Sequence, residues 1–220
     1  ITDDGESRLN WSNKWPMFLQ AAMLVRDSDA YTEEFDTAMR AMTVTGLNYS
    51  TAYKQTENRA MWGVVLNLAS GAFLGDRAVF DKALFRWSDL MATCIAGNVP
   101  VSEIDRGSNS LYYCNFYLNA ATQAAEIARF SGEWLYDWTG PDGSTFRETW
   151  QKVAYWTAHP EAFPYWQPTG TPRIQAHVDP LHALWPTDDS QLLIDTYTTT
   201  QDYFGFRQGI LAYRGRPLFG

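Results

Sequence analysis

The chain has 220 residues, 45% of them hydrophobic, which is enough for one domain with a substantial core. Seventeen basic and twenty-five acidic residues give a net charge of −8, which argues against nucleic acids and anionic membranes as main partners. Two cysteines and three histidines, none in a metal-binding spacing, give no sign of a metal or other cofactor.

The first part of the chain alternates helical patterns with short breaks. Apolar residues three and four positions apart predict a helix from Trp15 to Val25. Asp29, with Glu33 downstream, has the pattern of an N-cap for a second helix, which Gly46 ends. A loop rich in Thr, Asn and Tyr is expected over residues 43–56.

Three further helices are predicted over residues 58–74, 78–96 and 110–130, each ended by a break that contains glycine. Helices joined by loops of only a few residues are typical of antiparallel hairpins. Small residues such as Gly63 and Gly71 would let neighbouring helices approach closely.

The C-terminal part has a looser pattern. A short helix is predicted over residues 146–158, and a last one over 190–197. Between them, residues 160–186 are rich in proline and aromatic residues and favour an ordered wrapping loop, while only residues 209–213 suggest a strand. We therefore predict one all-α domain over residues 1–220, built from antiparallel helical hairpins.

Two segments concentrate polar residues. The first, Q-T-E-N-R-A-M-W-G at residues 55–63, opens a predicted helix, and the second, P-V-S-E-I-D-R-G-S-N-S-L-Y-Y-C-N-F, covers residues 100–116. They resemble the two signature segments of alginate lyases with a helical-toroid fold, which are T-x-N-H-x-x-W and a proline followed by E-x-x-R-G-x-x-x-L-x-Y-x-N-F. The resemblance extends from about Trp11 to Phe130. The matching residues are Thr56, Asn58, Trp62, Pro100, Glu103, Arg106, Gly107, Leu111, Tyr113, Asn115 and Phe116.

This resemblance implies an (α/α) toroid, or part of one, that cleaves a uronic-acid polymer by β-elimination. Asn58 and Arg106 correspond to the family's residues that neutralise the substrate carboxylate as the C5 proton leaves. Tyr113 corresponds to the tyrosine that takes this proton and returns one to the departing O4. We expect these three residues and Arg59 to be catalytic, and an acidic polysaccharide to be the partner.

Arg59 departs from the family, which has histidine at this position. Arginine stays protonated at ordinary pH and cannot act as a general base, so the acid–base chemistry would depend on Tyr113 alone. One residue acting from one face predicts syn elimination, which suits mannuronate or glucuronate and disfavours guluronate, iduronate and galacturonate. Asn109 also departs from many relatives, which have a basic residue there. A glucuronan-like substrate, or a loss of activity, are therefore alternatives to alginate cleavage.

Four residues are expected to bind the substrate: Trp62, Glu103, Asn109 and Lys54. Trp62 lies four positions after Asn58 on the same helix face and could stack on a sugar ring, although core packing is an equal alternative. A basic lining for the polyanion could come from Lys54, Arg173, Arg207, Arg214 and Arg216.

The catalytic candidates also have purely structural alternatives. Asn58 could be only the N-cap of its helix. Arg59 could form an ion pair with Glu57 or Glu103, and Tyr113 could hydrogen-bond across a helical hairpin. These alternatives stay open at the level of sequence.

The histidines and cysteines give weaker signals. His177 and His182, with Asp179 nearby, faintly suggest a metal site or an acid–base pair, but histidines in loops are more often polar anchors. Cys94 and Cys114 could form a disulfide or remain buried thiols.

Two other function classes compete with a lyase. A helical-toroid glycoside hydrolase would use two carboxylates, for which Glu57, Glu103 and Asp105 are the candidates. A catalytically inactive polyuronate-binding protein would keep the site without the reaction.

Two further expectations concern the missing part of the toroid and the cellular location of the protein. It has fewer hairpins than a full toroid, so a second chain or an upstream segment would complete one. It begins at Ile1 rather than Met, which suggests a processed product or a fragment. Because uronic-acid polymers occur outside the cytosol, a secreted or periplasmic location is expected.

Overall fold

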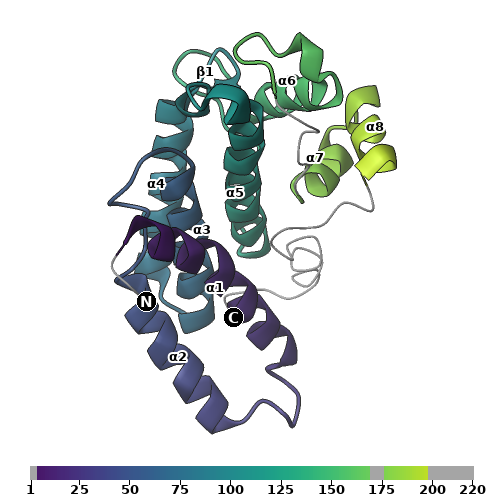
Figure 1. Cartoon of the computed structure of the whole chain (residues 1–220). Helices are drawn as coiled ribbons and strands as arrows, with labels where there is room; N and C mark the ends of the chain where they lie inside the picture. Colours follow the sequence, from purple (N-terminus) through teal and green to yellow (C-terminus); the bar gives the residue numbers. More distant parts are fainter. Residues whose placement is uncertain (1–3, 169–175, 198–220) are drawn as a thin grey trace.

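The structure, a computed structural model, describes residues 4–168 and 176–197 (Figure 1). These residues form eight α-helices, three short 3₁₀-helices and one two-stranded antiparallel sheet. The prediction of an all-α fold is confirmed. Within the described residues, no helix is long and apolar enough to cross a membrane.

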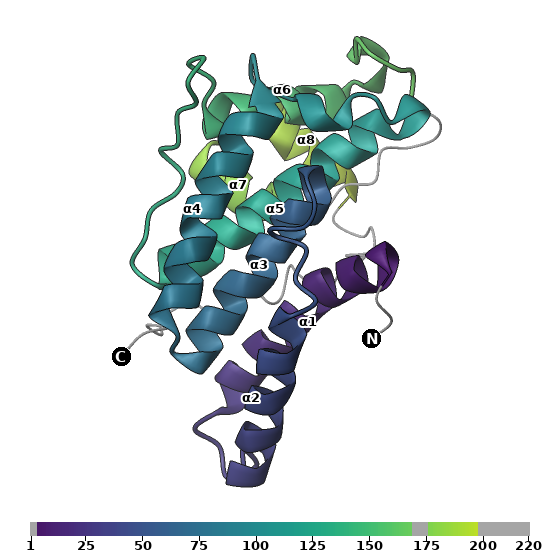
Figure 2. The ribbon, with the colours of Figure 1, turned by 90° about the vertical axis from the view of Figure 1, so that its left-hand side faces the viewer.

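Helices α1 (Gly5–Val25) and α2 (Glu33–Leu47) form an N-terminal hairpin at the lower end of the molecule (Figures 1 and 2). α1 begins well before its predicted start because the Asp4 carboxylate accepts hydrogen bonds from the first backbone N–H groups of the helix. Thr32, rather than Asp29, caps α2, and this helix continues into the predicted loop.

Helices α3 (Glu57–Leu74), α4 (Arg77–Cys94) and α5 (Ser110–Phe130) form the centre of the molecule. α3 packs against α1, α4 and α5, and nearly all of its side chains are buried. Gly75, with φ of 72°, ends α3 in the left-handed conformation and lets the chain turn directly into α4. The predicted helices agree with these three to within a few residues.

A small β-hairpin separates α4 from α5. Strands β1 (Ile95–Ala96) and β2 (Val99–Pro100) pair antiparallel, so the helix predicted to reach residue 96 ends earlier. Two 3₁₀ turns follow, at Val101–Glu103 and Gly107–Asn109, and the second leads into α5. The second motif segment therefore lies on this irregular connection and on the first turns of α5.

The C-terminal part forms three helices at the upper right in Figure 1. Helix α6 (Phe146–Ala158) has the predicted bounds, and its start is hydrogen-bonded to the turn between β1 and β2. The expectation of a wrapping loop over residues 160–186 is partly wrong, since this stretch contains α7 (Val178–Leu184). Helix α8 (Asp188–Tyr197) confirms the last predicted helix, and the strand predicted over 209–213 lies outside the described residues.

Both cysteines are core residues. Cys94 and Cys114 are buried, free thiols, so the disulfide alternative is wrong. Burial raises the pKa of the Cys114 thiol far above its ordinary value, which keeps it protonated and unreactive.

Candidate functional site

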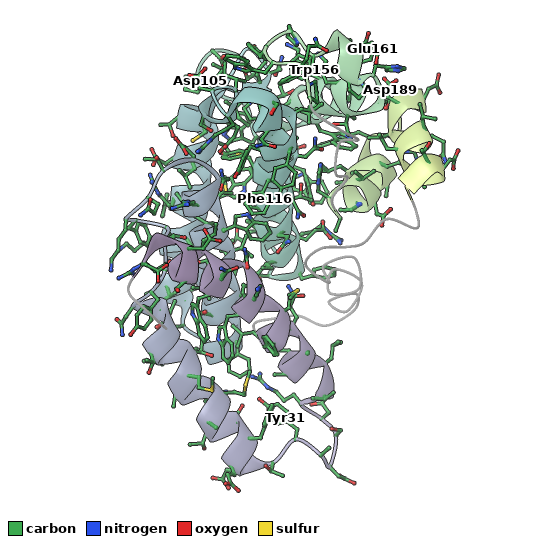
Figure 3. The ribbon with its side chains drawn as sticks, in the orientation of Figure 1. Tyr31, Asp105, Phe116, Trp156, Glu161 and Asp189 are labelled. Carbon is green, nitrogen blue, oxygen red and sulfur yellow. The ribbon has the colours of Figure 1, made fainter. Side chains whose placement is uncertain are left out.

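The two motif segments meet at the carboxylate of Glu103, which is fully buried. The backbone N–H of Asn58 donates to Oε1 of Glu103 at 2.8 Å, and Nδ2 of Asn58 donates to Oε2 at 2.9 Å. Thr56 is the N-cap residue of α3, so the N-cap alternative for Asn58 is wrong. Asp105 and Phe116, labelled in Figure 3, mark the path of the second segment from its loop down α5.

Glu103 has the environment of a positioning residue. Burial raises the pKa of its carboxyl group, while the two hydrogen bonds from Asn58 and the positive charge of Arg106 oppose that rise. Nε of Arg106 lies 3.4 Å from Oε2 of Glu103. Since its side chain is inaccessible and surrounded by these donors, the expectation that Glu103 contacts the substrate is wrong. It holds two other motif residues in place instead.

Arg106 lies between two carboxylates and an aromatic ring. Besides its contact with Glu103, its Nη2 contacts Oε2 of Glu57. Its guanidinium carbon lies 5.1 Å from the centre of the Tyr113 ring. The side chain is 34% exposed, so the guanidinium can still offer N–H groups to a carboxylate that arrives from solvent.

Tyr113 lies in the first turn of α5, as the motif predicts. Its ring is half-buried and packs edge-on against Tyr112, at 5.2 Å between centroids, and against Phe116, at 6.3 Å. No hydrogen bond joins its hydroxyl group to another described residue, so the alternative of a bond across a hairpin is wrong for this part of the chain. Within the part of the chain that the structure describes, the hydroxyl thus has no hydrogen-bond partner.

Together, these residues form a small and specific chemical arrangement. Glu103 fixes Asn58 and Arg106 relative to each other, and Arg106 in turn covers the ring of Tyr113. A carboxylate bound to Arg106 would lie beside a tyrosine whose hydroxyl has no partner among the described residues. Such a pairing suits proton abstraction next to a carboxylate, with the growing negative charge held by N–H donors. The individual catalytic roles stay predictions.

Arg59 points away from this arrangement. Its Nη2 lies 3.8 Å from Oε2 of Glu6, near the start of α1. The predicted ion-pair partners, Glu57 and Glu103, are therefore wrong: both are engaged by Arg106. Arg59 connects α3 to the N-terminal helix, and its side chain is 42% exposed.

The remaining substrate-binding candidates lie in different environments. Trp62 is fully buried and packs against Phe116, with ring centroids 5.2 Å apart. No face of its ring can stack on a sugar, so the expected sugar contact is wrong and the core alternative holds. Lys54 is exposed and donates to the carbonyl of Asn48 at 3.3 Å, while Asn109 is exposed in the turn before α5. Both stay predictions.

The other basic candidates fall outside the described residues: Arg173, Arg207, Arg214 and Arg216. The two histidines expected to be polar anchors are described. His177 is fully buried against Trp150, with ring centroids 5.4 Å apart, and burial lowers its pKa to about 3. Nδ1 of His182 lies 2.7 Å from Oγ of Ser190. The described part of the chain holds no group of three side chains arranged for a metal ion.

A pocket of about 480 Å³ lies elsewhere, between the loop after α5, the first half of α6 and the end of α7. Trp138, Arg147 and Trp185 are among the residues that line it. It shares no residue with the two motif segments, so it does not contribute to the arrangement around Glu103.

The sequence did not reveal the role of Glu57. This residue begins α3 with φ of 61°, in the left-handed region that favours glycine. A glutamate carries no signal for that conformation, and its partner Arg106 lies far away in the sequence. Only the three-dimensional structure therefore identifies the contact.

Comparison with known proteins identifies the family of the chain and a protein of similar fold. Residues 9–163, well over half of the chain, match the family model described as alginate lyase. The crystal structure of an alginate lyase from Bacteroides ovatus has a similar fold, with a TM-score of 0.59 and 16% sequence identity. The similarity covers 91% of this chain and 52% of that chain, so this chain spans about half the length of that enzyme. No curated protein sequence matches.

Proposed function

Because the chain belongs to the alginate lyase family, we propose that it is a polysaccharide lyase that cleaves a uronic-acid polymer by β-elimination. The observation that carries this proposal is the arrangement of Arg106 over Tyr113, with Asn58 and Arg106 both held by the buried Glu103. It provides a carboxylate-binding cation directly beside a tyrosine whose hydroxyl has no partner among the described residues.

The proposed reaction begins with the uronate carboxylate bound to Arg106 and the Asn58 amide. These donors stabilise the enolate-like dianion that forms as the C5–H bond breaks. The Tyr113 oxygen, as tyrosinate, takes the proton from C5, and the electron pair of the C5–H bond passes into the enolate-like dianion. This pair then forms the C4=C5 double bond as the C4–O4 bond breaks; the electrons of that bond go to O4, which takes the proton from Tyr113. The tyrosinate is thereby restored.

The stereochemistry follows from the position of Arg59. An arginine stays protonated and cannot serve as a base, and here it is paired with Glu6. Tyr113 would thus act as both base and acid from one face of the sugar. Syn elimination fits mannuronate or glucuronate, in which H5 and O4 lie on the same face. We therefore propose polymannuronate or a glucuronan as the substrate, and a guluronate polymer as a poor one.

The hydrolase alternative is less well supported. Of its three carboxylate candidates, Glu103 is fully buried, and both Glu103 and Glu57 are in contact with Arg106. A buried carboxylate with hydrogen bonds on both oxygens cannot reach a glycosidic oxygen or a water on the opposite face of a sugar. The pair that remains is Glu57 and Asp105, and Glu57 is held by Arg106 in the empty site.

The proposal extends to the organisation of the whole protein. Residues 1–220 would form one domain that corresponds to part of an (α/α) toroid, since the similarity covers only 52% of the alginate lyase of known structure. A second chain or an upstream segment would complete the substrate-binding surface. Because its polymer substrate occurs outside the cytosol, we propose a secreted or periplasmic location.

The test is an assay of the chain on polymannuronate, polyguluronate and glucuronan, with ultraviolet absorbance and reducing ends measured together. Elimination leaves a C=C bond conjugated to the carboxylate, so absorbance should rise on polymannuronate or glucuronan and much less on polyguluronate. Tyr113→Phe keeps the ring under Arg106 and removes only the hydroxyl, so the rise should fall by at least about a hundredfold.

The other outcomes separate the alternatives. New reducing ends without absorbance would support a hydrolase. Neither signal, together with retained binding of the polymer, would support an inactive binding protein. A Tyr113→Phe variant with full activity would refute the role proposed for the tyrosine even if the enzyme is a lyase.

A further inference from the structure

Arg106 has two anionic partners of different kinds. Glu103 is fully buried, and Asn58 donates hydrogen bonds to both of its oxygens. Glu57 is 38% exposed, and among the described residues only Arg106 pairs with its carboxylate. A buried carboxylate with several donors keeps its position, whereas a half-exposed carboxylate with one partner exchanges readily. Glu103 is therefore the permanent counter-ion of Arg106, and Glu57 is the exchangeable one.

The backbone at Glu57 points to the same distinction. Its φ of 61° is rarely adopted by a residue with a side chain, and such strain persists only where surrounding contacts maintain it. This conformation starts α3, with the next N–H group bonded to Glu103 and the Glu57 side chain against Arg106. The position thus carries a carboxylate where the backbone conformation alone would favour glycine. A role for the carboxylate itself explains this choice.

We propose that Glu57 occupies the place of the substrate's uronate carboxylate on Arg106 in the empty enzyme, and that the incoming uronate displaces it. The identity of the incoming anion rests on the function proposed above. The side chains of Arg106 and Glu57 are 34% and 38% exposed, whereas Glu103 is fully buried, so of the two carboxylate contacts of Arg106 the one with Glu57 is the one that solvent and substrate can reach. One guanidinium group then serves two carboxylates in turn.

The displacement makes Glu57 a specificity-determining residue. A neutral sugar has no anion to exchange for the glutamate and leaves the ion pair intact. A uronate replaces one carboxylate by another, so the charge balance around Arg106 is kept during binding. Competition with Glu57 lowers the affinity for every uronate, and removing its charge should therefore strengthen binding.

The experiment compares Glu57→Gln with its parent in a Tyr113→Phe background, in which bound sugar is not turned over. Isothermal titration calorimetry with saturated trimannuronate measures affinity, and neutral mannotriose serves as the uncharged ligand. The glutamine keeps the size of the side chain and removes its charge. We expect trimannuronate to bind about two- to fivefold more tightly, as for loss of one competing exposed ion pair, and mannotriose binding to be unchanged.

A matched control is available at the other end of α5. Glu133 pairs with Arg77 at 2.5 Å, and its side chain is 38% exposed, the same fraction as for Glu57. Glu133→Gln should leave trimannuronate affinity unchanged. If Glu57→Gln fails to fold, Glu57→Gly, which suits the left-handed backbone, should show the same tighter binding.

The readouts distinguish this inference from the proposed reaction. With Tyr113 present, Glu57→Gln should lower KM by more than it changes kcat. Suppose that Glu57→Gln binds trimannuronate more tightly but the protein with Tyr113 gives no absorbance on any polymer. This result would support the displacement and contradict the proposed lyase activity. Equal or weaker binding in an active lyase would overturn the displacement and make Glu57 a residue that only orients Arg106. Failure of both trimannuronate and the corresponding saturated glucuronate trisaccharide to bind any of these proteins would overturn both.

Discussion

At the scale of single residues, the buried carboxylate of Glu103 determines the geometry on which the proposed reaction depends. It accepts from the backbone and side chain of Asn58 and lies 3.4 Å from Nε of Arg106. A neutral amide in its place would present an NH₂ group to one of these donors. Asn58 and Arg106, which are both proposed to bind the substrate carboxylate, would then no longer be held by the same acceptor.

We therefore predict that Glu103→Gln lowers kcat by about ten- to a hundredfold with a smaller change in KM, since a small misplacement of catalytic groups has effects of this size. Steady-state kinetics on polymannuronate, with thermal unfolding followed in parallel, would measure both effects. The control is Glu126→Gln. Glu126, which lies on α5, is another buried carboxylate and accepts hydrogen bonds from Tyr136 and Arg129. The Glu126→Gln substitution should lower stability and leave kcat unchanged. Equal losses of kcat in both variants would contradict a specific role for Glu103.

The candidate site shows where sequence reasoning succeeds and where it stops. The motif predicted Asn58, Arg106 and Tyr113 as a group, and the structure brings all three together because the start of α3 lies beside the connection that carries Glu103 and Arg106 into the first turn of α5. It could not tell that Trp62 is buried, because a tryptophan has the same sequence signal in a core as on a sugar-binding face. The alternative of a structural ion pair for Arg59 named Glu57 or Glu103 and missed Glu6, which lies on a helix turn that the apolar pattern did not predict.

At the scale of elements, the close contact of α3 with the loop before it holds the first motif segment in place. A Cβ atom at Gly63 would lie 2.0 Å from the backbone nitrogen of Ala52. Thr51, in the same loop, donates from its hydroxyl to the carbonyl of Arg59 at 2.5 Å, and the same hydroxyl lies within hydrogen-bond distance of the Ser12 hydroxyl, at 3.2 Å. The loop thus joins α3 to α1, and it cannot move away from Gly63 without breaking these bonds.

Gly63→Ala should therefore be strongly destabilising. Overpacking against a fixed backbone costs about 1–3 kcal/mol or more, which corresponds to a fall in Tm of roughly 3–10 °C for a domain of this size. Gly71→Ala is the comparison with a milder clash, because a Cβ atom at residue 71 would lie 2.9 Å from its nearest neighbour, the backbone nitrogen of Phe80. Differential scanning calorimetry should give the larger fall for Gly63. The reverse order would show that the loop yields more easily than the hydrogen bonds suggest.

The elements also show why some of the fold was not predictable. Helix α6 has clear signals at both ends, and its predicted bounds are confirmed. Helix α7 was taken for a loop because it contains Pro180, yet a proline in the first turn of a helix removes an N–H group that has no helical partner anyway. Strands β1 and β2 have two residues each, too few for an alternating pattern. Short elements therefore depend on their tertiary contacts.

At the scale of the whole molecule, buried ionisable groups make the stability of the fold depend on pH. His177 is fully buried, and no described residue bonds to either ring nitrogen. Burial lowers its pKa to about 3, against an ordinary value of 6.5. Burial also favours the neutral form of Glu103, and for a carboxylic acid this raises the pKa. The two groups therefore have opposing effects on stability as the pH falls.

The sign for His177 follows from proton binding. Below pH 6.5 the unfolded chain binds a proton on this histidine, while the folded protein stays neutral until the pH approaches 3. Protons then favour the unfolded state, so the contribution of His177 falls as the pH is lowered from 6.5 towards 3. The slope is at most about 1.4 kcal/mol per pH unit. Above about pH 7 this contribution is constant.

His177→Phe isolates this effect, because phenylalanine keeps an aromatic ring beside Trp150 and cannot bind a proton. Urea unfolding of the two proteins at pH 8, 7, 6, 5 and 4.5 would give the difference in their free energies of unfolding. This difference cancels the contribution of Glu103 and of the surface carboxylates, which both proteins share. We expect it to be constant above pH 7 and to shift in favour of the phenylalanine variant by about 1 kcal/mol per unit below pH 6. A difference that stays constant down to pH 4.5 would mean that His177 is accessible to solvent protons in the folded protein, and that α7 opens without unfolding of the rest.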